Sequence, residues 1–382
     1  MSETTSSYLD DETIEIEDQD NIPEGDVDLE DLVMDDPFNP AEISIISKAD
    51  TLRNIIERLH LEEIDMTTAF QRNADLWDPA KMSRLIESIL IRFPLPAFYF
   101  DASNDEKWLI VDGLQRLSAI RNFVDTKELS LRGLEYLVQF NGYKYDDLPR
   151  TYQRRIDECA VTLFLIQPGT PDPVKYSLFR RINTGGLVLN NQEIRNAMAS
   201  TATRDYLRKL ADYEYLKKTI GNQSKRMLDQ ELVLRYLAFK FMDYERSKKN
   251  ITTFLDEMIE KLENSSPEEL EGYQISFQRT MKRCWQLFGD DAFEKRVKDQ
   301  STRRRRKSST LFEVWTNSLA MLTEEDMGVL LERKELLLQK NLDLTTEDND
   351  YFRSITYSTQ KKDHFRTRRD KVAEIIREVL DA

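Results

Sequence analysis

Residues 108–120 read WLIVDGLQRLSAI, so an apolar run passes into an amphipathic run through a single Asp-Gly pair. The apolar run at 109–111 predicts a strand that is buried on both faces, since such a strand carries no alternating polar residues. After Gly113, apolar residues recur at spacings of three and four, as on one face of a helix: Leu114, Leu117, Ile120 and Val124. This stretch therefore predicts a strand that turns directly into a helix.

The Asp-Gly turn has a structural and a functional explanation. Asp112 can cap the helix by accepting a hydrogen bond from a first-turn amide, and Gly113 allows a sharp turn and the close approach of a ligand. A helix N-terminus also attracts anions, so Gln115 and Arg116 stand where a phosphate would bind. Turns of this kind occur in many α/β proteins, so these residue types alone leave both explanations open.

Similar patterns predict the elements on either side. The expected elements are a helix from residue 51, a strand near 61–66, a helix from 78, strands at 97–100 and 161–166, and helices near 174–182, 190–197, 232–242, 251–262 and from 266. The region after residue 170 is almost entirely helical in pattern. We therefore expect an α+β protein with a disordered acidic tail at 1–43, a small mixed domain at 44–170 and a mostly α-helical domain at 171–382.

The charge of the chain is concentrated in its N-terminal segment. The 382 residues carry a net charge of −15, but residues 1–40 contain 15 Asp or Glu and no Lys or Arg. The remainder therefore has 70 − 15 = 55 acidic residues against 55 basic ones and is formally neutral. The composition of the tail is typical of disorder. It acts either as a solubilising tail or as a nucleic-acid mimic that covers a basic groove until DNA displaces it.

Two cysteines do not make a disulfide framework, and we expect Cys159 and Cys284 to be buried thiols. The N-terminus has no basic region leading into an apolar core, and no run of 18 apolar residues occurs. The sequence therefore gives no support for secretion or for a membrane partner. The cytoplasm is the default expectation.

Two basic runs are candidate contacts for DNA. The denser one consists of Arg303, Arg304, Arg305, Arg306 and Lys307, and the second extends from Lys361 to Lys371. Lysine and arginine neutralise nucleic-acid phosphates without regard to base sequence. A solvated surface loop would have the same composition, so both readings stay open.

The Asp112 stretch has companions in a fixed order along the chain. They are Phe70-Gln71-Arg72, Pro94-Leu95-Pro96, Phe179-Arg180-Arg181-Ile182-Asn183-Thr184-Gly185-Gly186 and Glu193-Ile194-Arg195-Asn196-Ala197. In this order and spacing they resemble the GmrSD restriction endonuclease N-terminal domain family, whose hallmark is Asp-Gly-Gln-Gln-Arg. The resemblance covers about residues 45–245.

The resemblance implies a domain distantly similar to the ParB/sulfiredoxin fold. Members of the family bind or hydrolyse NTPs in bacterial systems that attack modified or phage DNA, while a separate HNH nuclease domain makes the cut. For this chain it implies a pocket for an NTP with Mg²⁺. The cofactor-binding residues would be Gln71, Arg72, Gly113 and Asn183, and the catalytic residues Asp112, Gln115 and Arg116. Asp112 would position Mg²⁺ through a water or cap its helix.

Two features narrow these expectations. Leu114 replaces the first Gln of the hallmark, so nucleotide binding without turnover is one expected outcome. HNH chemistry needs a His as general base and further His, Asp or Asn ligands for a metal, and the chain has only His60 and His364. We therefore expect a regulatory component that acts with a separately encoded nuclease and does not cut DNA by itself.

Two other functions are compatible with the sequence. A non-catalytic ParB-like DNA-binding or scaffold protein would use Arg72, Arg116 and the run at 303–307 to contact phosphates. An immunity or toxin-regulating protein would work through the acidic tail.

Overall fold

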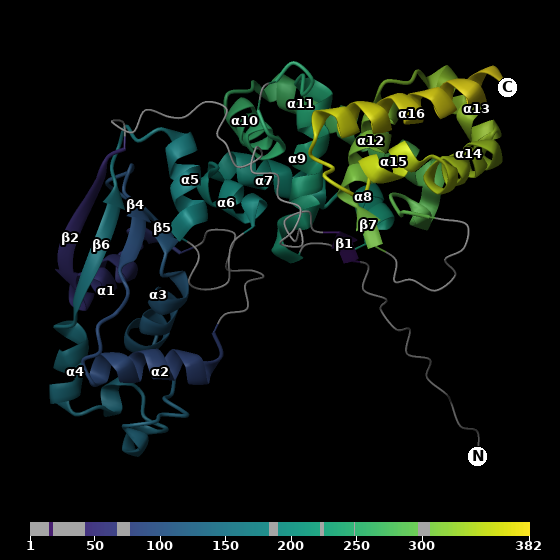
Figure 1. The fold of residues 1–382 in the computed structure, drawn as a ribbon. Coiled ribbons are helices and arrows are strands. Elements are labelled where there is room, and N and C mark those ends of the chain that lie inside the picture. Colours follow the sequence, from purple (N-terminus) through teal and green to yellow (C-terminus); the bar gives the residue numbers. More distant parts are fainter. Residues whose placement is uncertain are drawn as a thin grey trace, which may run out of the picture. The chain divides into compact units, whose positions relative to one another are not determined.

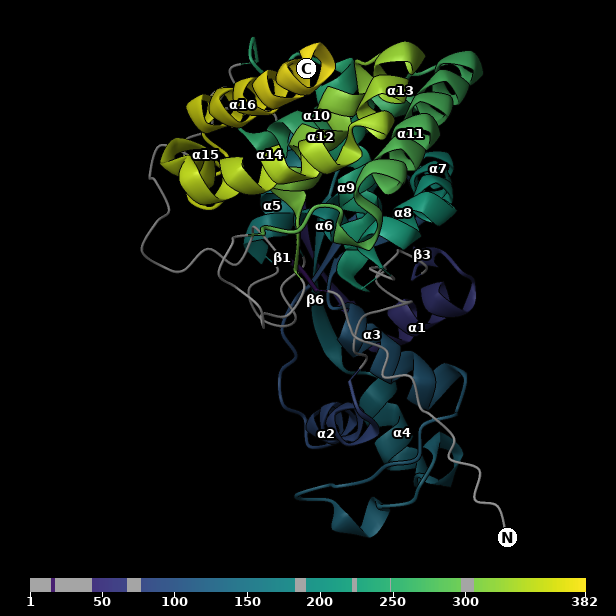
Figure 2. The same ribbon diagram turned by 90° about the vertical axis from the view of Figure 1, so that its right-hand side faces the viewer.

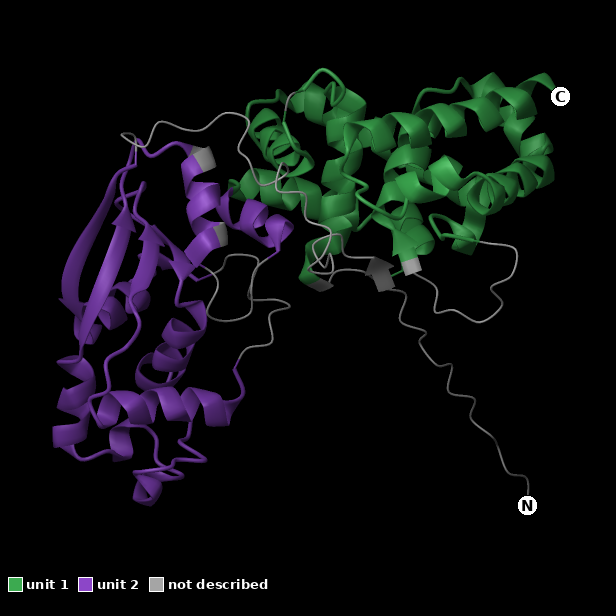
Figure 3. Ribbon diagram, in the orientation of Figure 1, with its two compact units in different colours: residues 1–35, 199–382 green, residues 36–198 purple. Residues whose placement is uncertain are grey.

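The protein is described by a computed structural model that covers residues 15–17, 43–66, 77–182, 190–221, 225–247, 249–296 and 306–382. The chain divides into two compact units (Figure 3). One contains residues 36–198, and the other contains residues 199–382 together with residues 1–35. The predicted α+β class is confirmed, because the first unit is built on a sheet and the second is mostly helical.

The first unit is organised around a five-stranded mixed sheet. Its order is β2 (Ile45–Thr51), β6 (Ala160–Ile166), β4 (Phe98–Asp101), β5 (Trp108–Asp112) and β3 (Ile64–Asp65). β2 with β6 and β4 with β5 are antiparallel, whereas β6 with β4 and β5 with β3 are parallel. The predicted strands are all present. The edge strand β2 was not predicted, because its residues are mostly exposed and show no apolar alternation.

Helices cover both faces of this sheet. The helices are α1 (Leu52–His60), α2 (Pro79–Leu90), α3 (Leu114–Ile120), α4 (Arg150–Asp157), α5 (Asp172–Ile182) and α6 (Asn191–Met198), and shorter helical turns are η4 (Arg121–Asp125), η5 (Val138–Phe140) and η6 (Tyr145–Asp147). Phe98, Phe100 and Ile110 pack with α1–α4 in one apolar cluster. Val111 packs with α5 and α6 in another. Successive strand residues point to opposite faces, which explains why the apolar run of β5 is continuous.

The α2 helix shows how the local sequence sets an element boundary. Asp78 caps it by accepting hydrogen bonds from the amides of Ala80 and Lys81 at 2.8 and 2.9 Å, and Pro79 occupies the first helical position. α6 begins with a capping box, in which the amide of Asn190 donates to Glu193 at 2.7 Å and the amide of Glu193 donates to the Asn190 side chain at 2.8 Å. α2 and α4 lie side by side (Figures 1 and 2).

A buried carboxylate fastens an irregular loop to α2. Glu87 accepts hydrogen bonds from the backbone N–H groups of Glu135, Tyr136 and Leu137 at 2.7–3.0 Å. Burial by itself would raise the pKa of Glu87. The three donors and the charge of Arg84 outweigh it, so the pKa lies below its ordinary value of 4.5.

Replacing Glu87 with glutamine is expected to lower the free energy of unfolding at pH 7 by about 1–3 kcal/mol, because an amide leaves a buried donor without a good partner. A lowered pKa stabilises the fold above the ordinary pKa of 4.5, and this stabilisation disappears as the pH falls through the lowered value. Urea unfolding at a series of pH values measures both effects. The difference between wild type and Glu87→Gln should shrink in acid, and parallel curves would contradict the assignment.

The second unit is a helical assembly. Its elements are α7 (Thr201–Ala211), α8 (Glu214–Ile220), η7 (Lys225–Met227), α9 (Leu228–Phe241), α10 (Ile251–Glu263), α11 (Pro267–Phe288), η8 (Gly289–Asp291), α12 (Ser309–Ala320), α13 (Glu324–Glu332), α14 (Lys334–Glu347), α15 (Asn349–Ser354) and α16 (Lys362–Asp381). α10 buries its whole predicted apolar stripe. α12 is buried nearly all round and contacts α9, α11 and α16, so it forms the centre of the unit.

An ionic network lies inside this helical core. The carboxylate of Glu313 on α12 is only 1% exposed and binds Arg235 of α9 at 3.1 Å and Arg368 of α16 at 2.6 Å. Arg235 also contacts Glu231 at 3.1 Å. Burial by itself would lower the pKa of Arg235, but the charges of Glu231 and Glu313 outweigh burial, so the pKa lies above its ordinary value. The network therefore ties three helices together through fixed charges.

The boundary between the units lies later than the expected position at residue 170. α5 and α6 are helical as predicted, but Tyr176, Phe179 and Ile194 pack against Val111 of the sheet, so the first unit extends to residue 198. In the N-terminal tail, residues Glu15–Glu17 form the strand β1, which pairs with β7 (Arg306–Ser308), and the rest of the segment 1–42 lies outside the described residues. No helix within the described ranges is long and apolar enough to span a membrane.

Candidate functional site

The junction between β5 and α3 differs from the expected helix cap. Gly113 occupies the N-cap position with φ +106°, and no side chain caps the helix. The Asp112 carboxylate instead accepts a hydrogen bond from the Arg116 guanidinium at 2.8 Å. The prediction that Asp112 caps α3 was therefore wrong. Arg116 lies four residues further on and so on the same side, and its charged guanidinium is a stronger donor to the carboxylate than a backbone amide.

Gly113 is required by its backbone conformation and by its surroundings. A φ of +106° is accessible to glycine and strained for other residues. A Cβ at this position would lie 2.4 Å from Cδ1 of Phe98. On the side of Gly113 where a Cβ would project, the ring of the buried Phe98 occupies the space, so a ligand cannot approach from that side.

The guanidinium of Arg116 is directed into the protein. It donates hydrogen bonds to the carbonyl oxygens of Pro96 and Ala97, the latter at 3.1 Å, in addition to Asp112. It also lies 4.5 Å from the centroid of the Phe98 ring, and the residue is 8% exposed. Burial lowers the pKa of Arg116, and the Asp112 charge opposes that effect. Arg116 therefore holds Asp112 and the start of β4 in place rather than projecting towards a phosphate.

The two residues between Gly113 and Arg116 point to different environments. The side-chain oxygen of Gln115 accepts a hydrogen bond from the backbone N–H of Trp77 at 3.1 Å, which fixes the chain just after the Gln71-Arg72 motif. Leu114 is partly buried and packs against the apolar clusters on both faces of the sheet. An apolar residue therefore stands where the hallmark of the resembling family has glutamine.

Several predicted site residues fall outside the described part of the chain. They are Gln71, Arg72, Asn183, Arg303, Arg304 and Arg305. α6, by contrast, supplies buried polar side chains to which the sequence gave no site role, namely Gln192 and, from the companion motif at 193–197, Arg195 and Asn196. The amide of Gln192 donates to Asn196 at 2.7 Å, and Arg195 donates to Gln192 at 3.3 Å. The sequence feature that could have indicated these buried polar side chains is the high content of Asn, Gln and Arg in a helix whose apolar residues face the sheet.

The junction is better suited to supply a magnesium ligand than a phosphate ligand. Mg²⁺ bound with a nucleotide commonly takes one or two carboxylates, with phosphate and water oxygens completing its coordination. The Asp112 side chain is 33% exposed, and only its Oδ2 is engaged by Arg116, so it fits such a role. Arg116 is less suited to bind phosphate, because its side chain is only 10% exposed and donates to Asp112 and to two backbone carbonyls. Among the described residues, no three His, Cys, Asp or Glu side chains lie close enough to hold a metal ion together.

Lys307, the last residue of the denser basic run, is less available to DNA than the sequence predicts. Lys307 is 1% exposed, and its ammonium group donates to the carbonyls of Asp290 and Ala292 and to Glu294. The prediction that Lys307 binds nucleic acid was therefore wrong, since a fully buried ammonium cannot reach a phosphate. Arg306 begins β7.

The second basic run is also occupied by internal partners. Arg368 binds Glu313, Lys371 binds Asp348 at 2.9 Å, and Arg369 binds Glu245 at 2.6 Å. Arg366 contacts both Glu245 and Asp363. These pairs offset part of the positive charge of α16, and Arg368, whose side chain is 3% exposed, lies in the core.

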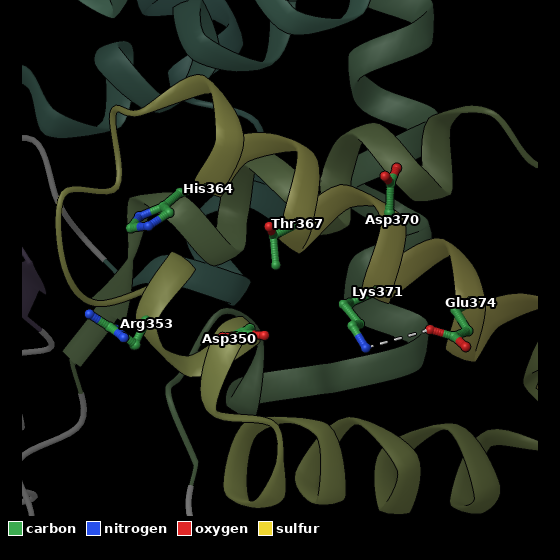
Figure 4. A pocket seen from close by; sticks show the side chains of 7 residues that line it. All are labelled: Asp350, Arg353, His364, Thr367, Asp370, Lys371 and Glu374. Carbon is green, nitrogen blue, oxygen red and sulfur yellow. Dashed lines mark ion pairs between the residues drawn. The ribbon is translucent and has the colours of Figure 1, made fainter.

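A cavity of about 590 Å³ opens between α15 and α16 in the helical unit (Figure 4). Its lining includes Asp350, Arg353, His364 and Lys371. The Nδ1 atom of His364 lies 2.8 Å from the carbonyl oxygen of Tyr357, which can only accept, so Nδ1 carries the proton. None of the predicted nucleotide-binding or catalytic residues lines this cavity.

The fold and the junction define a class of protein: a small mixed α+β unit with an Asp-Gly-x-Gln-Arg motif at a strand–helix turn, followed by a helical unit. Residues 52–200 match the family described as GmrSD restriction endonuclease, N-terminal domain. This chain therefore carries a domain of that family, which indicates a role in a restriction or defence system. Searches among curated proteins and among solved structures found no match to the chain.

Proposed function

We propose that this protein is an NTP-binding regulatory component of a DNA restriction or anti-phage defence system and acts with a separately encoded nuclease. The observation that supports the proposal is the Asp112 carboxylate, which is fixed by Arg116 at the centre of the family motif and remains partly exposed. In this proposal Asp112 holds Mg²⁺ of a magnesium–nucleotide complex. The cation would offset the charge of the phosphates.

The other residues of the motif would act on Asp112 or on the shape of the site. Arg116 is a positioning residue, since its guanidinium is largely buried and donates to the Asp112 carboxylate and to two backbone carbonyls. Gln115 would hold the end of the segment that contains Gln71 and Arg72, through its hydrogen bond to Trp77. Arg72 is then the arginine that we expect to contact phosphate, because a free guanidinium matches phosphate oxygens bidentately.

Slow or absent hydrolysis follows from the residue at position 114. Phosphoryl transfer to water needs a group that orients the attacking water. Leu114 cannot donate or accept a hydrogen bond, and its side chain is packed among apolar groups. We therefore propose that nucleotide binding, rather than turnover, is the regulatory event, and that nucleotide release resets it.

Asp112→Asn is expected to weaken Mg²⁺-dependent NTP binding by about tenfold or more, because a neutral amide is a poor magnesium ligand. Isothermal titration of the full chain with each of the four common NTPs measures the affinity. Asp125→Asn is the matched control, since Asp125 also faces an arginine four residues away, Arg121 at 3.8 Å, but lies outside the motif. The nucleotide proposal fails if the wild-type protein binds none of the NTPs in the presence of Mg²⁺.

Arg116→Lys separates positioning from direct phosphate contact. Lysine keeps the positive charge but cannot reach two carbonyls and the Asp112 carboxylate at once. If Arg116 positions Asp112, the Mg²⁺ dependence of binding is expected to shift to higher Mg²⁺ concentrations while Mg²⁺-independent affinity stays the same. A loss of affinity that is equal with and without Mg²⁺ would instead indicate a direct phosphate contact.

A further inference from the structure

The strand β7 joins two distant parts of the sequence. β1 (Glu15–Glu17) pairs with it in parallel, with Glu15 opposite Arg306, Ile16 opposite Lys307 and Glu17 opposite Ser308. β1 comes from the acidic N-terminal segment, whereas β7 follows directly on the run of arginines that starts at Arg303. The most acidic segment of the chain is thus paired with the strand that ends its most basic run.

One edge of β7 is paired with the segment that contains Phe293 and Glu294. The amide of Ser308 donates to the carbonyl of Phe293 at 2.8 Å, and Lys307 forms an antiparallel bridge with Glu294. The buried Lys307 ammonium reinforces this edge through Glu294 at 3.1 Å and the carbonyl of Ala292 at 2.9 Å. The opposite edge carries β1, and a sheet edge of this kind is a template for an added strand.

The N-terminal segment has the chemistry to occupy this edge. An extended peptide gains main-chain hydrogen bonds by adding to a sheet edge, and its side chains supply specificity. Glu15 and Glu17 alternate with an apolar residue, and the segment 1–40 carries 15 carboxylates beside no cation. Since it belongs to the same chain, its effective concentration at the edge is high, on the order of millimolar.

We propose that β1 is a tethered acidic plug: it docks on the edge of β7 that Phe293 and Glu294 leave unused, and it competes with polyanions for the basic run that β7 ends. A nucleic-acid backbone would have to displace it, since both are extended anionic chains that need the same positive charge. Three paired residues make a weak ladder, so displacement at a moderate cost is feasible. This inference is independent of nucleotide binding at Asp112.

The decisive variant is Glu15→Pro with Ile16→Pro in the full chain. Successive residues of a strand direct their N–H groups to opposite sides, so a pair of prolines removes whichever donor faces β7. Glu12→Pro with Thr13→Pro is the matched control, because it removes one carboxylate and adds two prolines in the same segment, outside β1. The two variants therefore differ only in the strand.

Two measurements test the plug. Amide hydrogen exchange at 306–308 is expected to become faster in the strand variant and to stay at the wild-type rate in the control. Affinity for a mixed-sequence DNA duplex at low salt is expected to rise about tenfold in the strand variant only, the effect of losing one or two main-chain hydrogen bonds.

Unchanged exchange at 306–308 would overturn the docking itself. Faster exchange with the same DNA affinity as the control, or no binding of DNA by any variant, would overturn the competition with polyanions. Neither result bears on NTP binding, so failure of the plug and failure of the proposed function remain distinguishable.

Discussion

Replacing Glu313 with alanine is expected to lower the free energy of unfolding by about 3–5 kcal/mol, the usual cost of removing one partner from a buried ion pair. The carboxylate is the shared acceptor of Arg235 and Arg368, and its removal leaves two buried guanidinium groups facing each other across a cavity. Arg235 retains Glu231, but Arg368 would keep only backbone acceptors, including the carbonyl of Thr359 at 2.8 Å. Denaturant unfolding followed by tryptophan fluorescence measures the change.

The matched control is Glu378→Ala on α16. Glu378 also pairs with a cation, Lys340 at 2.6 Å, but its side chain is half exposed. Water screens such a pair, so its loss is expected to cost less than about 1 kcal/mol. Similar costs for the two variants would mean that the Glu313 network contributes no more than a surface pair. Glu313→Gln should fall between them, because it keeps the volume and loses the charge.

Gly113→Ala is expected to lower the free energy of unfolding by about 2–6 kcal/mol. Backbone strain at a positive φ accounts for about 1–3 kcal/mol. Overpacking accounts for about another 1–3 kcal/mol, because the new methyl group would meet the ring of Phe98, which is fully buried and cannot retreat. Unfolding by urea measures the sum.

Gly169→Ala separates the two contributions. Gly169 has φ +86° and belongs to the same unit, but a Cβ there would meet no atom within 4 Å. Its substitution should therefore show the backbone strain alone, and the excess cost at Gly113 should report the Phe98 contact. If the two glycines cost the same, the close contact with Phe98 relaxes at no cost and plays no part in fixing the junction.

The sequence predicted the central part of the first unit because burial on both faces leaves a clear pattern. β5 is a continuous apolar run between the two apolar clusters, and the second half of β6, from Leu163 to Ile166, is apolar and mostly buried. The edge strand β2 gave no such signal, because only its pairing with β6 holds it in extended form. α5 was predicted as a helix but was assigned to the wrong unit. Periodicity shows that a helix has an apolar face, but it does not show which element packs against that face.

At the junction, sequence reasoning identified the right residues and assigned some of them the wrong contacts. Asp112 was expected to accept from a backbone amide, and it accepts from Arg116 because Gly113 opens the helix in a left-handed conformation. The inward direction of Arg116 depends on the carbonyls of Pro96 and Ala97, which reach it only through the pairing of β4 with β5. Contacts of this kind are set by tertiary structure, and no local spacing reports them.

The same limit applies to the basic runs. A row of lysines and arginines predicts a solvated positive surface, yet Lys307 neutralises Glu294 inside the protein and Arg368 neutralises Glu313. A DNA-binding or scaffold role loses two of its expected phosphate contacts, since Arg116 and Lys307 are both turned inward. Of this run, Arg306 pairs with Glu15 of β1, and Arg303, Arg304 and Arg305 lie outside the described residues.

The ion pair of Asp112 with Arg116 also determines the electrostatic field around the centre of the motif. Taken together the two side chains carry no net charge, so the junction creates no long-range field that would draw anions from solution. A ligand recognised there must be selected at contact distance, by shape and by the cation it brings. Recognition of that kind should be nearly indifferent to ionic strength, unlike attraction to a bare row of arginines.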